Sequence, residues 1–341
     1  MLNIISRSYV EGEINGPQKV VTTLIKGLNK INYPYCINKD LTATSQVWIH
    51  DDPVAFEQAC RRGIKALAGP NIYVLPRHIP KDIDLSSIVY IQPTEWITTF
   101  WKRLGFSACP IDVWPSAIDT DTFTARTQPE KGSVLIYHKQ RSIEELDFVV
   151  NIFKKKNIPY QIIRYGSYEQ KEYIDALKNT TYICWLGRHE TQGIALEEAL
   201  AMNVPALVWD VHALGHWLPR KKDQDLYTAE ELIYPDVTSA EYFDERCGIK
   251  TKDKDAIERS IDTMESNWRT YTPRDYIVEN LNPEKQARAL INLYQKHFNI
   301  SYEQGIRETM RNNKPWINDT MTFKVRSHIK ALAKRILGKK G

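Results

Sequence analysis

Residues 187–206 read Gly-Arg-His-Glu-Thr-Gln-Gly-Ile-Ala-Leu-Glu-Glu-Ala-Leu-Ala-Met-Asn-Val-Pro-Ala, and this stretch indicates the fold. The apolar run before it predicts a strand, and Ile194–Met202 predicts a helix. A helix that starts just after Gly193 offers unpaired backbone N–H groups and the positive end of its dipole to a phosphate. Glu190, in the loop, can accept hydrogen bonds from sugar hydroxyls. Glu198, two turns further on, can reach a ribose diol.

The same alternation of strand and helix patterns extends through the second half of the chain. Short β-rich apolar runs predict strands at Val134–Tyr137, Tyr160–Tyr165, Tyr182–Leu186 and Ala206–Trp209. Helical patterns lie between them at Ile143–Lys155, Gln170–Lys178 and Ile194–Met202. Repeated β-α units predict a parallel sheet with right-handed crossovers. Helices dominate from Lys254 to Phe298.

The first half of the chain repeats the alternation. Strands are expected at Leu2–Ser6, Val47–His50, Ile72–Leu75, Ile88–Ile91 and Ile111–Trp114. Helices are expected from Pro17, over Ala55–Lys65 and over Glu95–Leu104. The segment Ser116–Gly132 has no apolar periodicity and predicts a connection. A chain of 341 residues also exceeds what one core usually organises. We therefore predict an α/β fold with two Rossmann-like doubly wound domains facing a cleft, at 1–126 and 132–300, followed by helices and a basic tail at 301–341.

The stretch at residues 187–206 resembles the retaining glycosyltransferases of family 4, which have the GT-B fold. Their pattern runs roughly E-G-F-G-x-x-x-x-E-A-x-A-x-G-x-P. This chain matches it at Glu190, Gly193, Glu198, Ala199, Ala201 and Pro205. It departs from the pattern with Thr191-Gln192 in place of Gly-Phe and with Asn203 in place of Gly. These changes alter the loop wall beside the donor sugar, so the sugar is left open.

Further segments resemble the same family in the expected order, over most of Met1–Phe298. Val47-Trp-Ile-His-Asp-Asp-Pro is similar to the V-x-x-H-x-x-P of the N-terminal domain, whose histidine faces the transferred sugar. Thr94-Glu95-Trp96 resembles the S-E-W that opens a helix, and residues 114–123 resemble the motif at the domain junction. The resemblance implies that His50 contacts the sugar. The alternative is a histidine that is hydrogen-bonded for structural reasons.

The resemblance implies transfer of a sugar from a nucleotide-diphosphate donor, held by the second domain, to a hydroxyl acceptor on the side of the first. Glu190 and His50 would be catalytic. Cations after the strand Val134–Tyr137 would bind the diphosphate, although Lys139 and Arg141 could instead be exposed on a turn. The expected donor-binding residues are Lys139, Arg141, Gln192, Gly193, Ile194, Glu198 and Gly16. In a retaining transfer the leaving phosphate can take the acceptor proton, so no protein base is required.

We expect no metal and no cofactor besides the nucleotide-sugar co-substrate. Asp119-Thr-Asp121 matches the D-x-D by which another glycosyltransferase fold holds a metal. It coincides with the junction motif, which favours a structural role. Asp51 and Asp52 are an acidic pair of a kind that is usually solvated or caps a helix.

Composition suggests a cytoplasmic protein with a basic tail. The five cysteines are scattered along the chain, and no apolar run is long enough for a membrane span. The N-terminus lacks the pattern of a signal peptide, so we expect a cytoplasmic protein. Residues 324–341 carry seven Lys/Arg and no acid, which leaves 39 basic against 42 acidic residues elsewhere. The tail predicts a short amphipathic helix. Such a helix either lies peripherally on an anionic membrane or packs on the first domain.

Acceptors and rival functions remain open. A glycan, a lipid-linked glycan, another hydroxyl compound or a nucleic-acid base is compatible with the sequence. A nucleotide-sugar 2-epimerase of the same fold and an inactive sugar-nucleotide-binding scaffold are the alternatives. An NAD-dependent oxidoreductase is disfavoured, because Gly12 and Gly16 do not form a G-x-G-x-x-G fingerprint.

Overall fold

The computed structural model describes residues 1–10, 16–42, 45–127, 129–130 and 132–299. The chain folds into two compact units, of which one comprises Ile118–Asn282. The other combines Met1–Ala117 with the chain from Pro283 onward. Gly12 and the tail at 324–341 lie outside the described residues. None of the helices in the described part has the length and apolar composition that a membrane crossing requires.

The first unit is built on a parallel sheet of six strands in the order β2-β1-β3-β4-β5-β6. Its strands are β1 (Leu2–Ile5), β2 (Tyr35–Ile37), β3 (Gln46–Ile49), β4 (Ala66–Ala68), β5 (Ile88–Gln92) and β6 (Ile111–Val113). Its helices are α1 (Gly16–Lys30), α2 (Pro53–Arg61), α3 (Glu95–Arg103), α10 (Pro283–Phe298) and the 3-10 turn Pro76–His78.

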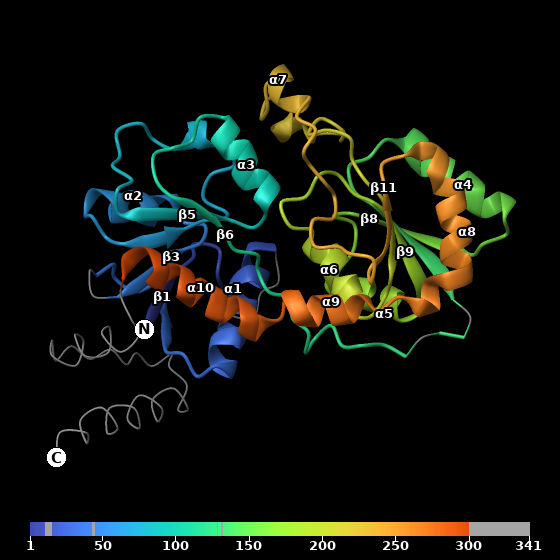
Figure 1. Ribbon diagram of the computed structural model, residues 1–341, viewed down its shortest axis with the longest axis horizontal. Coiled ribbons are helices and arrows are strands. Elements are labelled where there is room, and N and C mark those ends of the chain that lie inside the picture. Colours follow the sequence, from blue (N-terminus) through green and yellow to red (C-terminus); the bar gives the residue numbers. More distant parts are fainter. Residues whose placement is uncertain (11–15, 43–44, 128, 131, 300–341) are drawn as a thin grey trace, which may run out of the picture. The chain divides into compact units, whose positions relative to one another are not determined.

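The second unit is built on a parallel sheet of five strands in the order β11-β10-β9-β7-β8 (Figure 1). Its strands are β7 (Ser133–His138), β8 (Tyr160–Arg164), β9 (Thr180–Leu186), β10 (Ala206–Trp209) and β11 (Gly248–Thr251). Its helices are α4 (Ile143–Lys155), α5 (Gln170–Lys178), α6 (Ile194–Ala201), α7 (Ala229–Leu232), α8 (Ile257–Asn267) and α9 (Pro273–Asn280). Short 3-10 turns cover Lys221–Asp223, Lys254–Ala256 and Trp268–Thr270.

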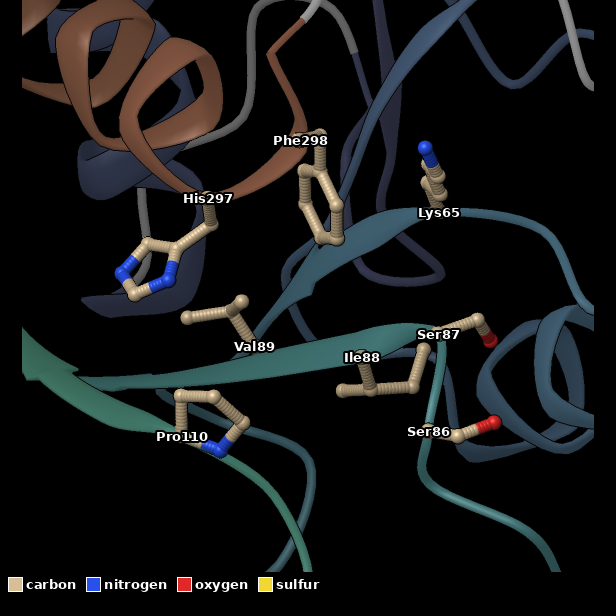
Figure 2. A pocket seen from close by; sticks show the side chains of 8 residues that line it. All are labelled: Lys65, Ser86, Ser87, Ile88, Val89, Pro110, His297 and Phe298. Atoms are coloured by element: carbon tan, nitrogen blue, oxygen red, sulfur yellow. The ribbon is translucent and has the colours of Figure 1, made fainter.

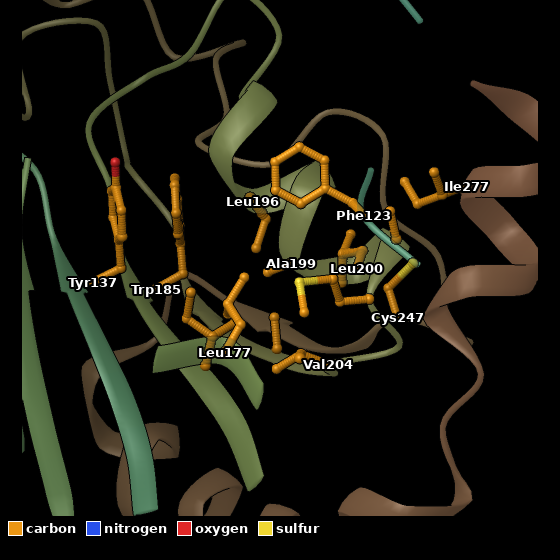
Figure 3. Close-up of a cluster of buried hydrophobic side chains, with 14 of the residues drawn as sticks. Phe123, Tyr137, Leu177, Trp185, Leu196, Ala199, Leu200, Val204, Cys247 and Ile277 are labelled. Carbon is orange, nitrogen blue, oxygen red and sulfur yellow. The ribbon is translucent and has the colours of Figure 1, made fainter. Parts of the chain in front are cut away.

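Alternating side chains of the central strands form two cores, one on each face of this sheet. Along β7, Leu135 and Tyr137 join the core that includes α6, whereas Val134 and Ile136 join the core that includes α4. The Tyr137 ring stacks on Trp185 of β9, with centroids 4.3 Å apart (Figure 3). Both faces of the strands are therefore buried, as expected for a parallel sheet that is covered by helices.

The expected two-sheet α/β fold is confirmed, but one strand was placed wrongly. Ile72–Leu75, expected as a strand, lies in bends and turns, and β4 (Ala66–Ala68) takes the place between β3 and β5 instead. Gly69 follows β4 with a positive φ of 106°, and Pro70 and Pro76 flank the apolar run. Proline has no N–H for a ladder hydrogen bond, so the run is poorly suited to a central strand.

The unit boundaries differ from the expected ones because the chain crosses between the units twice. Phe123 packs in the core of the second unit, although it belongs to the segment expected to be a connection. Helix α10 (Pro283–Phe298) returns to the first unit and lies beside α1 (Figure 1). The approach is close, since a Cβ at Gly27 would lie 2.0 Å from the Pro283 carbonyl oxygen.

Candidate functional site

The strand order of the second sheet marks one place for a ligand. The first strand, β7, lies between β8 and β9, so the order of strands reverses between β7 and β9. In open parallel sheets, ligands bind outside the carboxyl ends of the strands at such a reversal. Lys139 follows β7 and Glu190 lies in the loop after β9. Two of the residues expected to bind the donor are thus on the two loops that meet there.

Lys139 and Glu190 form an ion pair that is largely shielded from water. The Lys139 Nζ lies 2.6 Å from the Glu190 Oε1, and the two side chains are 13% and 8% exposed. The same ammonium lies 4.3 Å from the centroid of the Tyr165 ring, which follows β8. A charge pair with this little access to water is screened less than a surface pair. It gives the site a cation for a phosphate and a carboxylate for a hydroxyl.

A buried aspartate holds the segment to which the Glu190 amide bonds. Asp210, which follows β10 and is 3% exposed, accepts hydrogen bonds from the Ser239 amide at 2.6 Å and the Thr238 Oγ1 at 2.8 Å. The Thr238 carbonyl in turn accepts a hydrogen bond from the Glu190 amide at 3.0 Å. Carboxylates that accept several hydrogen bonds hold loops firmly, because charge-assisted bonds are the stronger ones.

Gly193 allows the loop to turn into α6. It has a φ of 98°, in the left-handed region that favours glycine, and its carbonyl accepts a hydrogen bond from the Leu196 amide at 2.9 Å. A Cβ at this position would lie 3.7 Å from the Glu190 Cβ. The N-terminus of α6, where Ile194 is the first residue, is thus placed beside the Lys139–Glu190 pair, and it can bind an anion.

Comparison with known proteins gives a likeness of structure only. No protein-family model and no curated protein matches the chain. The chain is similar to sucrose-phosphate synthase from Thermosynechococcus elongatus, at 11% identity and a TM-score of 0.57, over 88% of this chain and 99% of that one. It is also similar to the catalytic domain of starch synthase IV from Arabidopsis thaliana, at 8% identity and a TM-score of 0.52, over 86% and 98%. The fold is that of the GT-B glycosyltransferases.

A third similar structure is longer than this chain. The chain spans 58% of the length of TarM, with 81% of its own residues covered, 13% identity and a TM-score of 0.49. For the two synthases the identity is so low that the likeness concerns the fold alone. Activity must therefore be argued from the residues at the site.

In this GT-B fold, Glu198 lies deeper than Glu190. It is 3% exposed, in the second turn of α6. Burial raises the pKa of Tyr168 to about 12; the bond to the Tyr137 hydroxyl opposes this rise and the Glu198 charge adds to it. The Tyr168 and Tyr137 hydroxyls are 2.7 Å apart. Glu198 therefore belongs to a buried polar layer behind the α6 N-terminus, and its contact with a ribose stays a prediction.

Arg141 is buried and bonded to protein groups, and its expected role as a phosphate ligand stays a prediction. Its side chain is fully buried, and its Nη1 donates to the Gly187 carbonyl at 3.1 Å and to the Trp209 carbonyl at 2.9 Å. Its Nε donates to Glu145 at 2.9 Å, and the second nitrogen forms an ion pair with the same carboxylate. A guanidinium so occupied joins the loop after β9 to the last residue of β10. Of the two expected cations, Lys139 alone lies beside Glu190.

His50 is enclosed within the first unit. It follows β3, is fully buried, and its Nε2 lies 3.1 Å from the Pro17 carbonyl oxygen and 3.2 Å from the Asn71 side-chain nitrogen. Burial lowers its pKa to about 4, so the ring is neutral at physiological pH. Gly16 begins α1, and a Cβ there would meet no atom within 4 Å. The roles that the resemblance implies for His50 and Gly16 stay predictions.

The acidic pairs have structural partners. Asp52 caps α2 by accepting from the Ala55 amide at 2.9 Å, and Asp51 accepts from the Arg7 amide at 2.8 Å. Asp119 accepts from the Thr122 amide and hydroxyl, at 3.2 and 2.6 Å. Among the described residues, no three His, Cys, Asp or Glu side chains gather as metal ligands would.

A cavity of about 290 Å³ lies at the amino ends of three strands of the first sheet (Figure 2). Its lining includes Lys65, Ile88 and Pro110, which lie at the amino ends of β4, β5 and β6. His297 and Phe298 of α10 cover it. Ligands of open parallel sheets bind at the carboxyl ends of the strands, so this cavity does not belong to the candidate site.

Two residues of the site escaped the sequence analysis. Asp210 bonds to the segment at Thr238 and Ser239 that accepts from the Glu190 amide. Glu197, in α6, accepts a buried hydrogen bond from Gln192 in the preceding loop. An aspartate directly after an apolar strand was the available signal for Asp210. No local signal shows that Glu197, and not the adjacent Glu198, bonds to Gln192, because this depends on how α6 packs in the unit.

Proposed function

We propose that this chain is a glycosyltransferase that takes a sugar from a nucleotide-diphosphate donor bound to its second unit. The Lys139–Glu190 ion pair beside the α6 N-terminus carries this proposal, because it joins a phosphate-binding cation to a hydroxyl-binding carboxylate at the strand reversal. The GT-B fold supports it. The structure of the starch synthase IV catalytic domain contains ADP and acarbose, a nucleotide and a glycan.

Each group has a role in the proposed transfer. Lys139 and the α6 N-terminus bind the diphosphate and stabilise its charge as the sugar–phosphate bond breaks. Glu190 exchanges its bond to Lys139 for bonds to the sugar hydroxyls. Glu198 binds the ribose, as the resemblance implies. We expect a glycan or lipid-linked hydroxyl as acceptor.

We further propose that the transfer retains the anomeric configuration. The acceptor oxygen bonds to the anomeric carbon on the face from which the phosphate leaves, and the acceptor proton passes to the leaving phosphate oxygen. This route needs no protein base. It matches a site in which Lys139 and Glu190 are paired with each other and the neighbouring Arg141 is buried.

A donor panel tests the proposal. Purified protein is incubated with UDP-glucose, UDP-N-acetylglucosamine, ADP-glucose or GDP-mannose, and released nucleotide and the remaining sugar nucleotide are measured. Release of nucleotide from one donor, stimulated by a glycan acceptor, is the expected result. Conversion of the donor to its 2-epimer would favour the epimerase, and binding without turnover would favour the inactive scaffold. Either outcome contradicts the proposal.

The same assay tests metal independence. Asp119 is held in a turn by Thr122, and Lys139 can neutralise the phosphate, so we expect turnover to persist after exhaustive EDTA treatment. The control is EDTA-treated protein to which Mg²⁺ or Mn²⁺ is returned. Activity that is lost with EDTA and restored by either metal would show that the diphosphate is bound through a cation.

A further inference from the structure

Glu197 forms a buried side-chain pair with Gln192. Its Oε2 accepts a hydrogen bond from the Gln192 Nε2 at 2.9 Å, and the two residues are 2% and 5% exposed. The other oxygen, Oε1, is buried and meets no hydrogen-bond partner among the described residues. A carboxyl with this little solvation is costly to bury, so its retention calls for an explanation.

The surroundings of Glu197 are acidic. Burial is the main cause that raises its pKa well above the usual value, and the charges of Glu198 and Glu190 add to it. Lys139 compensates Glu190 through their ion pair. On α9, the Tyr276 hydroxyl has a raised pKa, mainly through burial, to which the Glu197 charge contributes.

Two cations in this unit, Arg246 and Lys250, have partners other than Glu197. The Arg246 guanidinium stacks 5.2 Å from the Tyr276 ring centroid and forms ion pairs with Asp244 and Glu279. Lys250 donates to the Ala240 carbonyl at 2.9 Å. A proton on Glu197 therefore satisfies the local charge balance. It also keeps a third negative charge away from the place where a diphosphate would bind.

Gln192 stands where the resembling pattern has an aromatic residue. An aromatic side chain forms a wall by packing, whereas an amide needs a hydrogen-bond partner to hold one orientation. Glu197 supplies that partner, from a position of the pattern that specifies no residue type. The two residues thus form one buried, hydrogen-bonded unit that joins the loop after β9 to α6.

We propose that Glu197 is a positioning residue for donor binding, whose carboxyl holds the Gln192 amide in the wall of the loop that receives the donor sugar. The inference rests on the proposed function. It adds that the sugar subsite has a polar wall and that the wall works with Glu197 in its neutral form. Glutamine can replace the neutral acid, because its amide oxygen can accept the same bond.

The test compares three variants with the wild type, using the donor that the panel identifies. Glu197→Leu removes the hydrogen bond between Gln192 and Glu197, and we expect its KM for the donor to rise at least about fivefold, the loss of one buried hydrogen bond. Gln192→Leu should raise KM similarly, and the double variant should be no worse than either. Glu197→Gln should restore most of the affinity. Glu258→Leu, which removes only surface pairs with Lys155 and Lys156, is the control.

The pH dependence gives a second readout that holds even where Glu197→Leu fails to fold. As pH rises through the raised pKa of Glu197, the wild type gains a negative charge at the site, so kcat/KM should fall. Glu197→Gln has no such proton to lose and should lack this limb. A wild-type KM in folded Glu197→Leu, or the same limb in Glu197→Gln, overturns the inference. If no donor is turned over by the wild type, the proposed function fails, and the inference fails with it.

Discussion

At the scale of single residues, burial separates side chains that look alike in sequence. Lys139 and Arg141 are two positions apart in one loop, and both are cations. Lys139 reaches Glu190, whereas Arg141 is fully buried and bonds to the Gly187 and Trp209 carbonyls. Arginine suits that place because its planar fork can donate to several acceptors at once.

Replacement of Glu190 by glutamine tests the central pair. The loss of its charge removes the ion pair with Lys139 and weakens the bonds to sugar hydroxyls in the transition state, so turnover should fall about 100-fold. Binding of UDP or ADP alone should not weaken, because Lys139 keeps its charge and a neutral amide competes less with the diphosphate for it. Released nucleotide and calorimetric binding are the measurements. Near-normal turnover by folded Glu190→Gln would contradict the assignment.

At the scale of elements, left-handed residues set both ends of α6. Gly193 begins it with a φ of 98°, and Asn203 follows it with a φ of 62°. After the helix, the Asn203 amide donates to the Leu200 carbonyl at 2.9 Å and the Val204 amide to the Ala199 carbonyl at 3.1 Å. The resembling pattern has glycine at the position of Asn203. Asparagine is the next residue type that tolerates this conformation, so the departure preserves the helix end.

Gly193→Ala tests the importance of this turn. The added methyl group has room, but the positive φ should lower the free energy of unfolding by about 1–2 kcal/mol. Gly166→Ala is the control for the backbone conformation, because Gly166 has a φ of 82° in a turn after β8 and a Cβ there would meet no atom within 4 Å. Both variants should lose similar stability in urea, but only Gly193→Ala should raise the KM for the donor. Equal effects on KM would show that the loop after β9 has no special part in binding.

At the scale of the whole molecule, the chain returns from the second unit to the first. Helix α10 (Pro283–Phe298) packs on α1, and Trp114 donates to the Gln286 carbonyl of α10 at 2.9 Å. The Tyr294 hydroxyl of the same helix donates to the Lys65 carbonyl at 2.8 Å. The first unit is therefore completed by residues from the far end of the sequence.

Gly27→Ala should destabilise the first unit selectively. Its methyl group would lie 2.0 Å from the Pro283 carbonyl oxygen, so α1 and α10 must move apart, at a cost of about 1–3 kcal/mol. Hydrogen exchange should show lower protection in α1 and α10 and unchanged protection in β7 and β9. Gly16→Ala, at the open start of the same helix, is the control. Unchanged protection of α10 in Gly27→Ala would contradict the contact.

The sequence by itself determined the local elements with strong internal signals. The expected bounds of α4, α5 and β10 agree with the structure. In α4, Ser142 accepts from the Glu145 amide, and the Glu145 carboxylate accepts from the Ser142 amide, a capping box that is readable in sequence. Glu190 and Gly193 could likewise be found, because the strand, loop and helix that place them are contiguous.

Tertiary structure alone decided the features that depend on packing between elements. Strands β2, β4 and β11 are three or four residues long and exist through pairing with neighbours, so composition does not reveal them. The burial of Arg141 depends on carbonyls at positions 187 and 209. The Glu197–Gln192 pair depends on which side of α6 the core covers, and the return of α10 depends on the surface of α1. Sequence periodicity does not indicate any of these contacts, because each depends on which surfaces the rest of the fold covers.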